Sequence, residues 1–151
     1  MTEEEKSLLS KDLCARQPYS VMINTPLFEK PTLLKGIADN MCWAVVDEDN
    51  YEWVDINDVK PYLRPLSSIS DKEKGELFKL CEYYEQEDWE RKITEVYGIE
   101  IASRFSLSYD TDFKLWNVDM RPIDWLNQHH FDYRNLIKKG LALEAPKDMY
   151  I

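Results

Sequence analysis

Four short segments rich in β-branched and aromatic residues lie close together in the first half of this chain, and they constrain its fold more than any other feature. They cover residues 19–23, 32–37, 41–46 and 51–56, with turn-forming residues between them. This spacing predicts four strands joined by short connections. Residues 47–50, Asp-Glu-Asp-Asn, have short polar side chains that bond to their own backbone, which is typical of a hairpin turn.

A tight turn and a final strand are predicted directly after these four strands. Residues 56–63 read Ile-Asn-Asp-Val-Lys-Pro-Tyr-Leu, a pattern that suggests one helical turn followed by a short strand. Meandering strands closed by such a turn form small SH3-like barrels. By analogy with that architecture alone, we predict an SH3-like β-barrel-type fold for this half of the chain.

Helices are predicted on both sides of the β-rich half. Thr2 and Glu5 match a capping box, which indicates a helix over residues 3–16 that ends before Pro18. A second capping box at Ser70 begins a long helical region. Two displaced apolar stripes in that region predict a bend near residues 86–88, and a β-hairpin is possible further on. The strands of that hairpin would be residues 99–107 and 113–118, and the alternative is that residues 99–105 extend the helix.

Two short helices are expected near the end of the chain. The first begins at Pro122 and runs to about His129, because proline is favoured at the first helical position. The second is capped by Asp132, and Gly140 lies where a left-handed residue would end it. The whole chain is therefore predicted to be α+β. Residues 1–66 form a helix and a small barrel-like subdomain and residues 67–151 a mainly helical one, or both form one compact domain.

The charge balance excludes some classes of partner. The 151 residues include 29 acidic and 19 basic ones, which gives a net charge of −10, and the basic residues are scattered. Both features work against nucleic-acid binding through phosphate contacts. No apolar stretch is long enough to span a bilayer, and the acidic N-terminal residues do not resemble a secretion signal. We expect a soluble, cytoplasmic protein with no membrane partner.

The cysteines and histidines carry no metal or catalytic pattern. Cys14, Cys42 and Cys81 are far apart in apolar surroundings, so we expect all three in the core, with no disulfide or zinc site. His129 and His130 are adjacent, and neighbouring helical residues point about 100° apart, so they cannot both ligate one metal in the usual way. One of them is expected to pack at a turn and the other to be solvated.

Other sites for ions, nucleotides or catalysis are equally unsupported. The spacing of Asp47, Asp49, Asp55 and Asp58 resembles a calcium-binding loop, but Glu52 stands where that loop needs glycine. A solvated hairpin tip is the better interpretation. The four glycines form no phosphate-binding loop, and no serine or cysteine lies in a nucleophile motif. We therefore predict no cofactor, no metal and no catalytic residue.

Aromatic residues supply the only candidate site. Alternation places Tyr51 and Trp53 on one face of a strand, and Tyr62 lies in the strand that follows. Small barrels often bind a peptide through such residues, and aromatic side chains anchor many interfaces. The sequence suggests Tyr51, Trp53 and Tyr62 as residues that bind a protein partner.

Two blocks of sequence carry a resemblance to a known family. They are DWLNQHHFDYRNLIKKGLALEAP at residues 124–146 and VKPYLRPLSS at residues 59–68. They resemble a family of short uncharacterised proteins from gut anaerobic bacteria and their phages or mobile elements. This family has no established activity, so the resemblance implies a biological setting and no site.

Three functions remain open from the sequence. The first is a non-enzymatic protein-interaction module of phage or mobile-element origin, which the aromatic content favours. The second is an acidic inhibitor that mimics DNA, which the net charge of −10 favours. The third is an enzyme whose site is assembled from distant residues.

Overall fold

Two compact units form the part of the protein that the computed structural model describes, which is residues 1–80 and 121–150. The first unit combines Met1–Leu63 with Leu136–Ile151, so segments from both ends of the chain fold together. The second unit is Arg64–Asn135. The predicted α+β class is confirmed.

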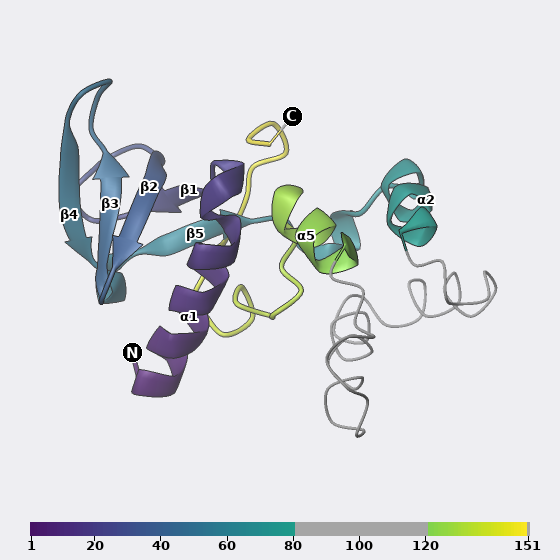
Figure 1. The fold of residues 1–151 in the computed structure, drawn as a ribbon, viewed down its shortest axis with the longest axis horizontal. Coiled ribbons are helices and arrows are strands. Elements are labelled where there is room, and N and C mark those ends of the chain that lie inside the picture. The colour runs from purple at the N-terminus through teal and green to yellow at the C-terminus, as the bar shows by residue number, and fades with distance from the viewer. Residues whose placement is uncertain (81–120, 151) are drawn as a thin grey trace. The chain divides into compact units, whose positions relative to one another are not determined.

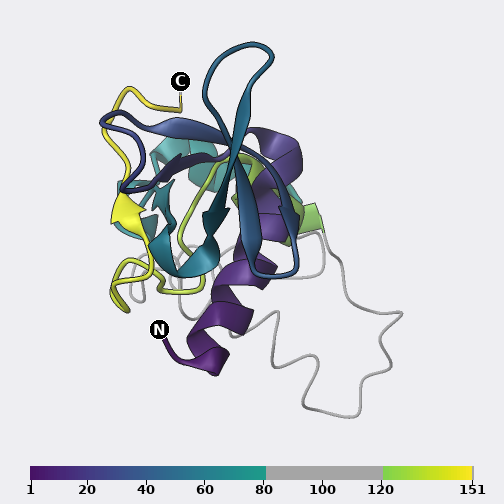
Figure 2. The same ribbon diagram turned by 90° about the vertical axis from the view of Figure 1, so that its left-hand side faces the viewer.

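One mixed sheet dominates the first unit, with its strands in the order β4-β3-β2-β1-β5-β6 (Figure 1). Neighbouring strands are antiparallel except β5 and β6, which are parallel. The β3–β4 hairpin projects beyond the rest of the sheet (Figure 2). The strands are β1 (Met22–Asn24), β2 (Thr32–Ala38), β3 (Met41–Val45), β4 (Tyr51–Asp55), β5 (Lys60–Leu63) and β6 (Leu143–Glu144).

The predicted SH3-like barrel is not confirmed, because this sheet is not closed. β5 pairs on one side with β1 and on the other with β6, a strand from the C-terminal end of the chain. The free side of β5, where a barrel would close, is therefore taken by another strand. Within the described residues β4 pairs only with β3.

The strands predicted between residues 32 and 63 are confirmed, whereas the first one begins later than expected. Gln17–Tyr19 forms a 3-10 helix (η1), and Ser20 has a left-handed backbone with φ 62°. Both conformations are incompatible with an extended strand, so β1 begins only at Met22. The tight turn predicted before the last strand is the 3-10 helix η2 (Ile56–Asp58).

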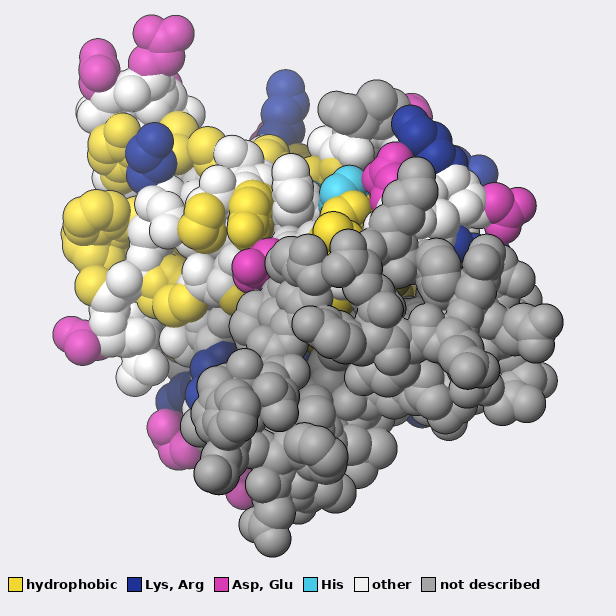
Figure 3. Space-filling view, turned by 45° about the vertical axis from the view of Figure 1, so that its right-hand side comes forward, with side chains coloured by type: hydrophobic (Ala, Val, Ile, Leu, Met, Phe, Trp, Pro, Cys, Tyr) yellow, Lys and Arg dark blue, Asp and Glu magenta, His cyan; other side chains and the backbone are white. Residues whose placement is uncertain are grey.

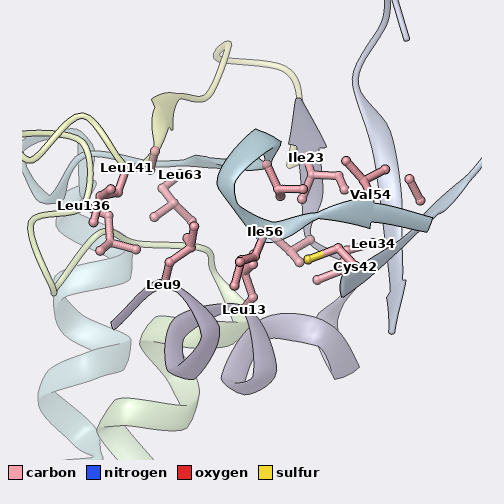
Figure 4. Packing of buried hydrophobic residues seen from close by; sticks show 14 residues of the cluster. Leu9, Leu13, Ile23, Leu34, Cys42, Val54, Ile56, Leu63, Leu136 and Leu141 are labelled. Atoms are coloured by element: carbon pink, nitrogen blue, oxygen red, sulfur yellow. The ribbon is translucent and has the colours of Figure 1, made fainter. Parts of the chain in front are cut away.

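The first helix, α1 (Glu3–Arg16), begins at the predicted capping box. The Thr2 hydroxyl accepts a hydrogen bond from the Glu5 N–H at 3.1 Å, and the Glu5 carboxylate accepts one from the Thr2 N–H at 2.7 Å. Leu9 and Leu13 of α1 are fully buried in the core of the first unit (Figure 4). That core consists of Leu9, Leu13, Val21, Ile23, Leu34, Cys42, Ala44, Val54, Ile56, Val59, Leu63, Leu136, Leu141 and Ala142.

Two of the three cysteines lie within the described residues. Cys42 is buried, as predicted, and its burial raises the pKa of the thiol to about 12. Cys14 is exposed, so the prediction that every cysteine faces the core is wrong. Cys14 lies on α1 one position after the buried Leu13, and a step of 100° around a helix is enough to turn a side chain from the core to solvent.

A fully buried ion pair lies on the inner face of α1. The Arg16 guanidinium donates hydrogen bonds to the Asp12 carboxylate from Nε (2.7 Å) and from an Nη (3.0 Å). Both side chains have no solvent exposure. Removing one partner of such a pair leaves a charge in a low-dielectric surrounding, which costs far more than breaking an exposed pair.

We predict that Asp12→Ala lowers the free energy of unfolding by about 3–5 kcal/mol, because it leaves the Arg16 charge buried without its carboxylate. The matched control is Glu3→Ala, which breaks the exposed i,i+3 pair with Lys6 and is expected to cost less than about 1 kcal/mol. Urea denaturation followed by circular dichroism measures both. Equal decreases in the free energy of unfolding in the two variants would contradict the burial of the Asp12–Arg16 ion pair.

The helix predicted to begin at Asp132 is wrong, although the left-handed residue predicted at its end, Gly140, is confirmed. Asn135 has φ 57°, which interrupts any helix that begins at Asp132. A single turn follows and ends in a Schellman motif: the Leu141 N–H donates to the Leu136 carbonyl (2.9 Å) and the Gly140 N–H to the Ile137 carbonyl (3.0 Å). Gly140 has φ 73°, as the sequence predicts for a left-handed cap.

The second unit has its own helices and its own apolar core. It contains η3 (Leu66–Ser68), α2 (Asp71–Lys79) and α5 (Arg121–Gln128), the last of which matches the helix predicted from Pro122. The predicted helix bend and the predicted hairpin lie in the region outside the described residues. Its core consists of Leu66, Ile69, Leu77, Trp125, Leu126, Phe131 and Tyr133.

The second capping box is confirmed and joined by an arginine. The Glu73 carboxylate accepts hydrogen bonds from the Ser70 N–H (2.8 Å) and from the Arg64 guanidinium (2.7 and 3.2 Å). Burial alone would raise the pKa of Glu73. The hydrogen bonds from Arg64 and Ser70 outweigh that effect and lower the pKa to about 2, from an ordinary value of 4.5.

We predict that the Glu73 carboxyl titrates near pH 2 in the folded protein. Because its folded pKa is below its unfolded value, Glu73 contributes its full stability above pH 4.5 and loses it as the pH falls toward 2. Carboxyl-detected NMR gives the midpoint directly. In Arg64→Gln the midpoint is expected to move toward 4.5, and a wild-type midpoint already near 4.5 would show that the pair does not hold in solution.

Candidate functional site

The turn of the β3–β4 hairpin organises the site. The Asp47 carboxylate accepts hydrogen bonds from the backbone N–H groups of Asp49 and Asn50 (each 3.2 Å) and from the Asn50 side-chain amide (2.7 Å). These bonds lower the pKa of Asp47, and the Asn50 side chain contributes most. The turn satisfies its own polar groups and is exposed, so the predicted solvated hairpin tip is confirmed.

The register of the hairpin places two tryptophans directly opposite each other. Trp43 of β3 and Trp53 of β4 are cross-strand partners, and their ring centroids lie 4.5 Å apart at an interplanar angle of 68°. Such edge-to-face aromatic pairs are favourable beyond the area they bury. The sequence pattern indicates Trp53 as a site residue but gives no signal for Trp43, whose partnership with Trp53 depends on the hairpin register.

The neighbouring strand leaves room for the Trp43 ring. A Cβ atom added to Gly36 of β2 would lie 3.1 Å from Cε3 of the Trp43 indole, closer than a side chain normally approaches. The β2–β3 register shifts between Leu34 and Gly36, which brings Gly36 opposite Trp43. The absence of a side chain at this position lets the indole approach the backbone of β2 closely.

Alternation along the strands separates a buried face from an exposed one. Cys42, Ala44 and Val54 are buried in the core, whereas Trp43 is 40% exposed and Trp53 is 46% exposed. Tyr51, two residues before Trp53 on the same face, is 47% exposed. We call the outer surface formed by Trp43, Tyr51 and Trp53 the aromatic face. Figure 3 shows hydrophobic side chains gathered on this side of the molecule.

Tyr62, the third predicted site residue, does not belong to the aromatic face. It lies on β5, and three strands separate β5 from β4 in the sheet order. Its hydroxyl lies 3.5 Å from the Asn24 side-chain oxygen, and its carbonyl accepts a hydrogen bond from the Tyr150 hydroxyl at 2.8 Å. The structure therefore brings Tyr51 and Trp53 together and places Tyr62 elsewhere.

Acidic residues are concentrated in the stretch of sequence that contains β4. The chain from residue 44 to residue 59, which contains the turn, β4 and η2, carries six acidic residues and no lysine or arginine. The Asn57 backbone N–H is the main cause that lowers the pKa of Asp55, and Lys6 of α1 adds a smaller electrostatic effect. The acidic residues are Asp47, Glu48, Asp49, Glu52, Asp55 and Asp58.

The two histidines lie in the second unit. His130 is buried at the turn after α5 with φ 58°, as expected for a histidine packed at a turn. His129 is half-buried rather than solvated, since its ring stacks on Trp125 at 4.0 Å and its Nδ1 lies 2.9 Å from the Trp125 carbonyl oxygen. Among the described residues, no group of three or more potential metal-ligating side chains lies together.

Comparison with known proteins finds no matching family model, curated protein or solved structure. In the described parts of the chain, no helix combines the length and apolar character needed to cross a membrane. The aromatic face and the acidic residues of the β3–β4 hairpin are the features of the described residues that bear on function.

We predict a favourable coupling of about 0.5–1.5 kcal/mol between Trp43 and Trp53, the range measured for packed aromatic pairs. Trp43→Val, Trp53→Val and the double variant form a double-mutant cycle, with free energies of unfolding from urea denaturation. A coupling energy of zero would mean that the two rings do not pack on each other in solution.

Proposed function

We propose that the protein is a non-enzymatic protein-interaction module that binds its partner through the aromatic face. The observation that carries this proposal is that two tryptophans and a tyrosine share one outer sheet surface and each stays at least 40% exposed. Tryptophan and tyrosine are the residues most enriched among those that dominate binding energy at interfaces. The phage or mobile-element setting implied by the family resemblance is part of the same proposal.

The rigidity of the aromatic face supports this role. Trp43 is held between Gly36 and Trp53, and the sheet beneath it is anchored in the core by Cys42 and Ala44. A side chain that is already ordered loses little conformational entropy when a partner binds. The packing that holds the rings in place therefore also prepares them for binding.

The acidic DNA mimic remains a second candidate because the residues from 44 to 59 are strongly acidic. A mimic of DNA needs carboxylates spaced like phosphates along a continuous face. In β4, Glu52 lies between the exposed rings of Tyr51 and Trp53 in the sequence and on the opposite face of the strand, so the carboxylates of β4 form no continuous acidic face. This arrangement favours a protein partner that contacts both rings and charges.

We predict that peptides selected from a displayed library of random linear sequences bind through the aromatic face. Trp53→Thr is expected to weaken their binding by about 30-fold or more, because truncating a hot-spot aromatic costs about 2 kcal/mol. Threonine keeps the β propensity of the strand. Fluorescence anisotropy with labelled peptides measures the affinity.

The matched control for this experiment is Leu27→Ala. Leu27 is 58% exposed and follows β1 in the chain, so the variant removes exposed apolar surface outside the aromatic face. Its binding should match that of the wild type. If no peptide is enriched, or if Trp53→Thr binds the enriched peptides as well as the wild type does, the proposed function is wrong.

A further inference from the structure

The backbone of β4 offers hydrogen-bonding groups along one side of the sheet. β4 is the terminal strand in the sheet order, and within the described residues it pairs only with β3. A terminal strand of this kind has a row of N–H and C=O groups that can pair with another chain. The kind of chain that can pair with β4 depends on which residues direct their backbone N–H and C=O groups outward and on the charges of the neighbouring side chains.

The hydrogen-bond pattern identifies the outward-facing residues. The Val46 N–H donates to the Asn50 carbonyl at 2.9 Å, and the Ile56 N–H donates to the Asn40 carbonyl at 2.8 Å. Hydrogen-bonded pairs alternate with non-bonded pairs in an antiparallel ladder. Asn50 and Ile56, which make these two bonds, are both even-numbered, so the even-numbered residues between them, Glu52 and Val54, also bond to β3. Tyr51, Trp53 and Asp55 therefore direct their backbone groups toward the free edge.

Two of these outward-facing residues also belong to the aromatic face. A strand added beside β4 would bond to the backbone of Tyr51 and Trp53 and at the same time place alternate side chains next to their rings. The other side chains of the added strand would point to the same side of the sheet as Glu52. One strand can therefore use the backbone edge, the aromatic face and the acidic groups together.

The β4 edge has no lysine, proline or bulge to prevent strand addition. Natural edge strands are often protected by lysine, proline or a bulge. β4 contains none of these residues, and its register with β3 is unbroken from Tyr51 to Asp55. Its charged residues, Glu52 and Asp55, are both acidic. They repel an identical edge from a second copy of the chain and attract a strand that carries positive charge.

We propose that the partner contributes an extended, lysine- or arginine-rich segment that adds to β4 as an additional strand. Alternate residues of this segment are apolar and pack against Tyr51 and Trp53, and the residues between them are basic and face Glu52. The six acidic residues between positions 44 and 59 provide the charge complementarity, since that stretch has no basic residue. This inference rests on the proposed function and names the chemistry and conformation of the partner.

The first test uses the heptapeptide acetyl-Lys-Val-Lys-Val-Lys-Val-Lys-amide, with acetyl-Glu-Val-Glu-Val-Glu-Val-Glu-amide as its charge control. Amide hydrogen exchange is followed by NMR with and without peptide. The lysine peptide is expected to slow exchange at Tyr51, Trp53 and Asp55 and to leave Glu52 and Val54 unchanged, since the latter two already bond to β3. No binding of the lysine peptide at about 1 mM, or equal binding of the glutamate peptide, overturns the proposal.

The second test removes one outward-facing backbone donor. Asp55 has φ −63°, which matches the fixed φ of proline, so Asp55→Pro deletes the N–H without straining the chain. Asp55→Ala is the matched control, because it removes the same carboxylate and keeps the N–H. Asp55→Pro is expected to bind the lysine peptide about fivefold more weakly than Asp55→Ala, the value of one hydrogen bond. Equal affinities of the two variants overturn strand addition.

These tests separate the inference from the proposed function. If Trp53→Thr abolishes peptide binding while the outward amides stay unprotected, the aromatic face binds peptides and strand addition is wrong. If the outward amides gain protection while Trp53→Thr binds normally, strand addition holds and the aromatic face is not the main source of affinity.

Discussion

The register of the β3–β4 hairpin is the constraint on which both the core and the candidate surface depend. Side chains alternate along a strand, so the pairing that buries Cys42, Ala44 and Val54 also places Trp43 and Trp53 together on the opposite face. A shift of β4 by one residue would turn its side chains over, moving Trp53 to the core side and Val54 to solvent. The aromatic face is therefore held in place by the same free energy that stabilises the first unit.

The two ends of the sheet are finished in different ways. At the β5 end, the C-terminal segment adds β6, and the Ala145 N–H donates to the Leu63 carbonyl at 2.8 Å. The Tyr150 hydroxyl accepts a hydrogen bond from the Met22 N–H (3.0 Å) and donates one to the Tyr62 carbonyl (2.8 Å). At the β4 end, among the described residues, no comparable segment is added. Of the two ends of the sheet, β4 is therefore the edge where another chain can pair.

Local chemistry explains which parts of the fold could be predicted. The capping boxes at Thr2 and Ser70 depend on side chains three residues apart, and the left-handed Gly140 depends on one residue type, so the sequence alone indicates them. The barrel could not be judged in this way, since its closure depends on which strand lies beside β5. The helix predicted from Asp132 failed because the left-handed backbone at Asn135 has only a weak sequence signal.

The candidate site shows the same division between local and distant information. Alternation along one strand was enough to select Tyr51 and Trp53. Trp43 could have been found only by assuming the exact residues of the turn, since its partnership with Trp53 depends on the register across the hairpin. Tyr62 was included because it is near in sequence, but in the sheet order three strands lie between β5 and β4.

By itself, the sequence determined the α+β class, the limits of most helices and strands in the described parts of the chain, and the strongly acidic character of the hairpin. Only the tertiary structure decided that the sheet stays open, that the chain end returns to pair with β5, and that Trp43 meets Trp53 above Gly36. The physical reason is that caps and turns are formed by residues a few positions apart. Sheet order and register are instead set by burying apolar surface from distant segments, and no local pattern records which segments meet.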